Sequence, residues 1–152
     1  MKNLVLIIIS VFFTSICYSK NTDIIHDFKI TFDCKLEKIM IKNKDFNYQT
    51  FTADNIEVDK KKVLKVVAAQ PSVLTINGLS EFIDTYSDIS KDDVRIAKND
   101  TILFKNIDKE KKYSESVFLN RSTGELIHEV TKNMNTKDNE KYISFFGCTK
   151  EL

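Results

Sequence analysis

The sequence predicts an all-β domain of mostly antiparallel strands, either a small β-barrel or a β-sandwich of about eight strands with one short helix. Apolar and polar residues alternate without interruption from Phe28 to Glu37, which is the period of a half-buried strand. Strand-forming runs then recur at spacings of roughly 8 to 12 residues, divided by turn signals such as Asn77-Gly78. A disulfide predicted between Cys34 and Cys148 would join the first long strand to the last, so these two strands are expected to be neighbours.

Residues 1–19 are expected to be a signal peptide. Met1-Lys2-Asn3 is a short basic start, the run Leu4–Ile16 is mostly apolar, and Cys17-Tyr18-Ser19 places small residues ahead of a cleavage site before Lys20. The apolar run of about 13 residues is shorter than the roughly 20 needed to cross a bilayer, so no stable membrane anchor is expected after cleavage. Lipid attachment to Cys17 is the alternative, although Ile16 is large for the residue before a lipidated cysteine. We therefore expect a periplasmic or secreted protein.

The remaining residues, 20–152, are expected to form a single disulfide-closed β-domain. Removing 19 residues from 152 leaves 133, a length that suits one ordinary domain. Removing Lys2 with the signal peptide takes the basic count from 23 to 22, against 22 acidic residues, and Arg95 and Arg121 are the only arginines. A balanced charge and so few arginines argue against nucleic acid as a partner.

Cys34 and Cys148 are the only cysteines after the signal peptide, and an even pair in an exported protein favours a disulfide. Closing a loop of more than 100 residues could stabilise the fold by roughly 4–5 kcal/mol through chain entropy. The competing interpretation is a metal-binding or nucleophilic cysteine. Neither cysteine has a cluster of histidines and cysteines or a base nearby in the sequence, so no metal and no cofactor are expected.

The expected elements follow in order. After Glu37 the alternation of apolar and polar residues is broken, because Lys38 is followed by Ile39, Met40 and Ile41, and this predicts a bulge or short turn. Apolar residues at helical spacing after Ser80, a good N-cap, predict a short helix from that residue. The polar stretch Lys132–Lys141 is expected to be a mobile loop. The further expected strands cover residues 46–50, 55–58, 63–69, 73–76, 94–98, 101–105, 113–120, 125–131 and 142–148.

The search for catalytic chemistry is mostly negative, and we predict that the protein is not an enzyme. The chain has no Gly-x-Ser-x-Gly elbow, no phosphate-binding glycine loop and no His-Glu-x-x-His motif. His26, beside Asp23 and Asp27, could bind a metal, but a solvated N-terminal segment is the favoured interpretation. His128 alternates with Leu126 and Val130, so it could be a pocket base or ligand contact, although a hydrogen-bonded core histidine is more common.

Two other groups of residues allow a functional and a structural interpretation. The lysines at 60–62 and 65, and those at 109, 111 and 112, could grip an acidic partner or lipopolysaccharide phosphates, but lysines at strand ends also keep sheet edges soluble. The aromatic residues Phe46, Tyr48, Phe51, Phe82 and Tyr86 could line a ligand cavity, although most aromatic residues fill a core. The structural interpretation is favoured in both cases.

The C-terminal part carries one resemblance. Residues 117–126 include Arg121-Ser122-Thr123-Gly124, and Phe146-Gly147-Cys148 follows close to the end. This part is similar to the tail of small exported Gram-negative β-proteins of unassigned function, which end in a strand, an Arg-x-Thr-Gly turn, a second strand and a terminal Gly-x-Cys. The resemblance implies a periplasmic β-domain.

Three functions follow as expectations. The first is a non-enzymatic protein-binding module of the inhibitor, immunity or envelope-adaptor type, contacting an envelope or cell-wall-acting protein through residues 80–93 or 132–141. The second is a carrier of a small apolar ligand, with a barrel cavity lined by the face of Phe28, Ile30 and Phe32. The third is an enzyme that uses His128 beside an acidic or hydroxyl partner.

Overall fold

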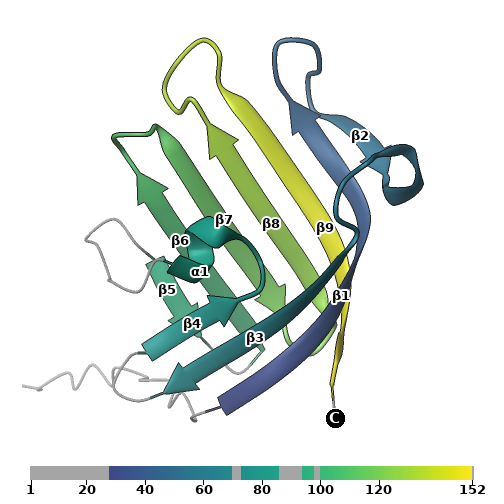
Figure 1. The fold of residues 1–152 in the computed structure, drawn as a ribbon, viewed down its shortest axis with the longest axis vertical. Helices are drawn as coiled ribbons and strands as arrows, with labels where there is room; N and C mark the ends of the chain where they lie inside the picture. Colours follow the sequence, from purple (N-terminus) through teal and green to yellow (C-terminus); the bar gives the residue numbers. More distant parts are fainter. Residues whose placement is uncertain (1–27, 70–72, 86–93, 98–99, 152) are drawn as a thin grey trace, which may run out of the picture.

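The computed structural model describes residues 28–69, 73–85, 94–97 and 100–151. The expected signal peptide, Cys17 and His26 lie outside the described residues, as does the part of the expected helix beyond Thr85. The described chain is mostly antiparallel strand, which confirms the predicted fold class. Its strands form one sheet that curls into a half-barrel (Figure 1).

Eight strands follow one another across the sheet in the order β4-β3-β1-β9-β8-β7-β6-β5, and β2 pairs separately with β1. The two edge strands, β4 and β5, contact each other, so the half-barrel comes together at one end while β1, β9, β8 and β7 extend further (Figure 1). The elements are β1 (Phe28–Lys42), β2 (Gln49–Thr52), η1 (Ala53–Asn55), β3 (Lys61–Ala69), β4 (Val73–Asn77), α1 (Glu81–Thr85), β5 (Val94–Ala97), β6 (Thr101–Asp108), β7 (Tyr113–Asn120), β8 (Glu125–Lys132) and β9 (Glu140–Lys150).

The first and last strands pair side by side, as the predicted disulfide required. Cys34 lies directly opposite Cys148 in the antiparallel register of β1 and β9, and their sulfurs are bonded. The register shifts between Leu36 and Lys38, which is the irregularity that the broken alternation after Glu37 predicted. The longest strand is therefore bent in its middle, and its two halves pair with different neighbours, β3 and β2.

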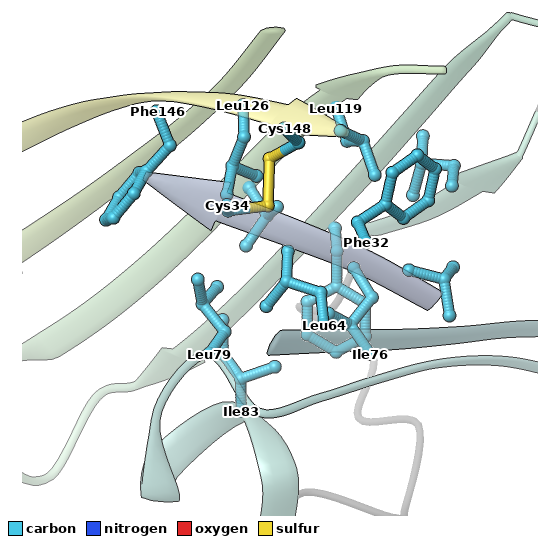
Figure 2. Close-up of a cluster of buried hydrophobic side chains, with 14 of the residues drawn as sticks. Phe32, Cys34, Leu64, Ile76, Leu79, Ile83, Leu119, Leu126, Phe146 and Cys148 are labelled. Atoms are coloured by element: carbon cyan, nitrogen blue, oxygen red, sulfur yellow. A yellow bond between two sulfur atoms is a disulfide. The ribbon is translucent and has the colours of Figure 1, made fainter. Parts of the chain in front are cut away.

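The core lies on one face of the curled sheet, which we call the inner face. Alternate residues of β1, such as Phe32 and Cys34, point into it, and residues of β3, β6, β7, β8 and β9 join them. Figure 2 shows the disulfide within this cluster, with Leu64 and Leu126 among its neighbours. Of the predicted ligand-lining face, Phe32 is buried in this core, and Phe28 and Ile30 are partly buried and pack against it.

The short helix α1 covers part of the inner face. Gly78 turns the chain after β4 with φ of +91°, and an added Cβ would stand 2.0 Å from the carbonyl oxygen of Val63, so this turn requires glycine. The hydroxyl of Ser80 accepts a hydrogen bond from the amide of Ile83 at 3.2 Å, which caps the helix as predicted. Leu79 and Ile83 are buried in the core, and they fix α1 on the sheet.

Two expected strands differ from the structure. Residues 55–58 do not form a strand; the chain makes a 3-10 turn at Ala53–Asn55 and runs irregularly to β3. The expected strand at residues 46–50 is instead β2, Gln49–Thr52. Asn43 is the reason, because its side-chain oxygen accepts hydrogen bonds from the amides of Asp45 and Phe46 and forms a turn, and Tyr48 follows with φ of +56°.

Candidate functional site

Three side chains from separate parts of the fold converge on the carboxylate of Glu115. Ser80 comes from the start of α1, Tyr113 from the start of β7, and His128 from the middle of β8. Glu115 is 2% exposed and His128 is 7% exposed, so both are buried among apolar residues. We call these four residues the Glu115 cluster.

Every contact in the Glu115 cluster is within hydrogen-bond distance. The hydroxyl of Ser80 donates to Oε2 of Glu115 at 2.6 Å, and the phenol of Tyr113 donates to Oε1 at 2.5 Å. Nε2 of His128 lies 2.8 Å from Oε2, and an ionised carboxylate can only accept, so this nitrogen donates. The carboxylate therefore has three donors on its two oxygens.

The strand register explains why Glu115 and His128 meet. Tyr113, Glu115 and Val117 alternate along β7 and point to the inner face. His128 is the direct cross-strand partner of Val117, so it is the diagonal neighbour of Glu115 on the same face. Phe82 of α1 packs edge-on against the Tyr113 ring at 4.8 Å, which holds the helix over this part of β7.

The donors also determine the ionisation of the cluster. Burial by itself raises the pKa of Glu115, because a buried carboxylate loses its hydration. The hydrogen bonds from His128, Ser80 and Tyr113, together with the charge of His128, outweigh burial and hold the pKa of Glu115 below its usual range. Burial first, and the adjacent carboxylate second, raise the pKa of Tyr113. Glu115 is thus the charged acceptor and Tyr113 a protonated donor.

The connectivity of the Glu115 cluster differs from that of a serine activated by a histidine. Nucleophilic catalysis by serine needs its hydroxyl hydrogen-bonded to a base, usually histidine. Here Ser80 and His128 both bond to Oε2 of Glu115, and no hydrogen bond joins the two among the described residues. What the cluster does physically is tie α1 to β7 and β8 through one buried charge.

The inner face beyond α1 is more open than the core. Ile41, Tyr142 and Val130 follow one another across β1, β9 and β8 and are partly exposed. Phe51 of β2 is the cross-strand partner of Ile39 and extends the same surface. We call the surface formed by Ile41, Phe51, Val130 and Tyr142 the open inner face. Its side chains are apolar or aromatic, and at its border the ammonium of Lys132 lies 5.4 Å from the centre of the Tyr142 ring, whose hydroxyl donates to Glu140.

Two polar groups lie at the border between the open inner face and the Glu115 cluster. His128 and Ser144 are direct cross-strand partners on β8 and β9. Nε2 of His128 is engaged by Glu115, whereas Nδ1 makes no hydrogen bond to a described residue. The hydroxyl of Ser144, which is partly exposed, makes none to a described residue either. A ligand on the open inner face would find hydrogen-bonding capacity here.

Of the residues singled out in the sequence, His128 lies in this site and the disulfide lies in the core, so the structure does not bring them into one site. Sequence reasoning missed Glu115, Ser80 as its partner, and Tyr113. The strand 113–120 was predicted correctly, and its alternation already placed Glu115 on the same face as Val117. A charged residue on the apolar face of a predicted strand was the available signal.

Within the described ranges, no three metal-binding side chains gather into a group that could hold an ion. Over the same residues, no helix has the length and hydropathy needed to span a membrane. In the terminal motif, the glycine and cysteine are adjacent, as Gly147 and Cys148, so the chain departs from the Gly-x-Cys spacing of the resemblance noted above.

Comparison with known proteins gives no relative: no family model, no curated protein and no solved structure matches this chain.

Proposed function

We propose that this protein is an exported, non-enzymatic binding protein that holds a small amphiphilic molecule on the open inner face. The observation that carries the proposal is an apolar surface bordered by two polar groups, Nδ1 of His128 and the hydroxyl of Ser144, that make no hydrogen bond to a described residue. Small-molecule sites combine these two features, because apolar walls supply affinity and a few polar groups fix orientation. Export is supported by the disulfide, since such bonds persist in oxidising compartments.

The ligand chemistry follows from the two kinds of surface. An alkyl or aromatic body would pack on Ile41, Val130 and Tyr142, which are already partly exposed. A hydroxyl or carboxylate head would reach Nδ1 of His128 and the hydroxyl of Ser144. The closed end of the half-barrel is filled by the core, so the ligand lies at the open end and not along Phe28.

A binding role fits the Glu115 cluster better than catalysis does. The cluster satisfies its buried charge with three donors, and among the described residues no hydrogen bond joins the Ser80 hydroxyl to His128. A fully satisfied network rigidifies its surroundings. Its role in this proposal is to fix the ring of His128 so that Nδ1 is presented at a constant place.

The test is a fluorescence titration with N-phenyl-1-naphthylamine, followed by competition with dodecan-1-ol and dodecanoate. We expect saturable binding of one probe per chain, displaced by both competitors. Val130→Lys places a charge on the open inner face and should weaken binding at least tenfold. Val63→Lys is the matched control, since Val63 is 50% exposed on the other face of β3, and it should bind like the wild type.

Two outcomes would count against the proposal. If the wild-type protein shows no saturable binding of the probe, no ligand site of this class exists on it. If Val130→Lys binds as well as the control while both keep the wild-type far-UV circular dichroism spectrum, the ligand lies elsewhere. Ser144→Ala tests the polar contact separately. It should weaken the binding of dodecan-1-ol without changing the affinity for N-phenyl-1-naphthylamine, which has no hydroxyl or carboxylate head.

Protein binding through a loop is the second candidate. Hydrogen bonds hold the loop between β8 and β9 in place. Within the loop, Thr136 donates both its amide and its hydroxyl to the carbonyl of Asn133, and the amide of Met134 donates to the carbonyl of Lys112 in the neighbouring turn. A loop held in one conformation loses little entropy on binding. Replacing residues 134–138 by a Gly-Ser linker should abolish capture of an envelope protein under this proposal and leave probe binding intact.

A further inference from the structure

The bond between His128 and Glu115 determines which ring nitrogen of His128 carries the proton. Burial raises the pKa of Glu115, but the hydrogen bonds from His128, Ser80 and Tyr113 outweigh burial and hold that pKa below its usual range, so the carboxylate is ionised at neutral pH. An ionised carboxylate offers only acceptors, and Nε2 of His128 lies 2.8 Å from Oε2. Nε2 therefore carries the hydrogen, and in the neutral imidazole Nδ1 is a bare acceptor.

Nδ1 and the hydroxyl of Ser144 form a pair of neighbouring polar groups. The side chain of His128 is 9% exposed, and Nδ1 makes no hydrogen bond to a described residue. Ser144 is the direct cross-strand partner of His128 and is partly exposed. Side chains in such a pair start from Cβ atoms about 4.5–5.5 Å apart. One small polar group of a ligand can therefore contact both.

We propose that the open inner face selects amphiphiles whose head group donates a hydrogen bond, such as long-chain alcohols, over those with an ether or an ionised carboxylate head. This inference rests on the proposed ligand site and names its ligand class. The hydroxyl of the ligand donates to Nδ1 of His128, and its oxygen accepts from the hydroxyl of Ser144. A hydroxyl makes both bonds through one oxygen, because it is donor and acceptor at once.

The surroundings of His128 work against a carboxylate head. Both oxygens of such a head are acceptors, so neither can bond to a bare Nδ1. Its charge would also lie close to the buried carboxylate of Glu115, where little water screens the repulsion between like charges. The nearby lysines are already balanced: Lys132 has Glu140 as its direct cross-strand partner, and Lys62 lies 4.0 Å from Asp59.

Competition for bound N-phenyl-1-naphthylamine tests this selection at about pH 8, where imidazoles are ordinarily neutral. The matched ligands are dodecan-1-ol and its methyl ether, which keeps the chain and the oxygen but lacks the hydroxyl hydrogen. We expect the alcohol to bind roughly fivefold or more tightly than the ether, the effect of about one hydrogen bond, and more tightly than dodecanoate. Equal binding of alcohol and ether would overturn this inference and leave the proposed function intact. Absence of saturable probe binding would instead refute the proposed function, and this inference with it.

His128→Lys removes the acceptor and keeps a donor for Glu115, because an ammonium has donors only. We expect the alcohol to lose its advantage over the ether in this variant and dodecanoate to gain relative to both. Val63→Lys adds the same charge on the other face of β3, where Val63 is 50% exposed, and it should keep the wild-type order of affinities. A folded His128→Lys that still prefers the alcohol would show that Nδ1 does not select the ligand.

The position of the proton is also measured directly, so the inference stays testable if His128→Lys does not fold. Long-range correlation of ring protons with ring nitrogens by NMR distinguishes a protonated nitrogen from a bare one. The chain has two histidines, so His26→Gln leaves the signals of His128 alone. At about pH 8 we expect Nε2 protonated and Nδ1 bare. A protonated Nδ1 under these conditions would contradict the proposed selection.

Discussion

The hydrogen bonds of Glu115 make a quantitative prediction about stability. Glu115→Ala removes the acceptor of three donors at once. Ser80 and Tyr113 are only partly buried and can be rehydrated, but His128 is 7% exposed and loses its only hydrogen-bond partner among the described residues. Leaving a buried donor without its acceptor typically costs about 1–3 kcal/mol, and more where the lost partner was charged. That is a large share of a domain's usual stability of roughly 5–15 kcal/mol.

The conservative variant Glu115→Gln separates charge from shape. The amide oxygen can still accept from Ser80 and His128, and the amide nitrogen can donate to Tyr113, so the number of hydrogen bonds is kept. Charge-assisted hydrogen bonds contribute roughly 1 kcal/mol more than neutral ones, so we expect a loss of about 1–2 kcal/mol. Glu129→Gln is the matched control: Glu129 pairs with Lys141 at 2.9 Å on the partly exposed outer face and should lose less than about 1 kcal/mol.

Urea unfolding at neutral pH, followed by circular dichroism, measures these differences. We expect the midpoint of Glu115→Ala to fall by roughly 1–2 M at an unchanged slope. The pH dependence provides a second signature. The pKa of Glu115 is lowered in the folded state from an ordinary value of 4.5, so its stabilisation is present above that pH and is lost as pH falls through the folded-state pKa. Glu115→Gln should lack this acid loss. A midpoint for Glu115→Ala within experimental error of the wild type would refute the reasoning.

Three further predictions use other parts of the fold. Reducing the bond between Cys34 and Cys148, which closes 114 residues, should lower the unfolding free energy by about 4–5 kcal/mol, measured as a lower urea midpoint in reductant; an unchanged midpoint would contradict the entropic argument. Gly124→Ala should lower the thermal midpoint by several degrees, because φ is +75° and the new Cβ would lie 2.1 Å from a backbone oxygen, whereas Gly147→Ala meets only the end of a flexible side chain and should cost far less. In a spectrophotometric titration, Tyr113 should stay protonated at pH values where an exposed tyrosine ionises, because burial raises its pKa; ionisation of all tyrosines together would show that its phenol is solvated.

Much of the fold was predictable because it depends on local alternation. The strands from residue 113 to residue 120 and from 125 to 131 were located to within a residue at each end, since side chains with period two have only one way to bury an apolar face. The predictions failed between residues 43 and 60, where Asn43 forms a turn and the chain bends into η1. Side-chain hydrogen bonds to the backbone overrode strand propensity there.

The sequence by itself determined the all-β class, most strand positions and the covalent pairing of Cys34 with Cys148, because periodicity and cysteine count are local or combinatorial properties. Only the tertiary structure decided that the sheet is a half-barrel and that Ser80 and His128 meet on Glu115. The contact of Ser80 with Glu115 spans 35 residues of sequence, and that of His128 with Glu115 spans 13. Both depend on the strand register and on the position of α1 on the sheet. A buried charge is stable only where several donors form hydrogen bonds to it. Here those donors are distant in the sequence, so only the folded chain brings them to the carboxylate.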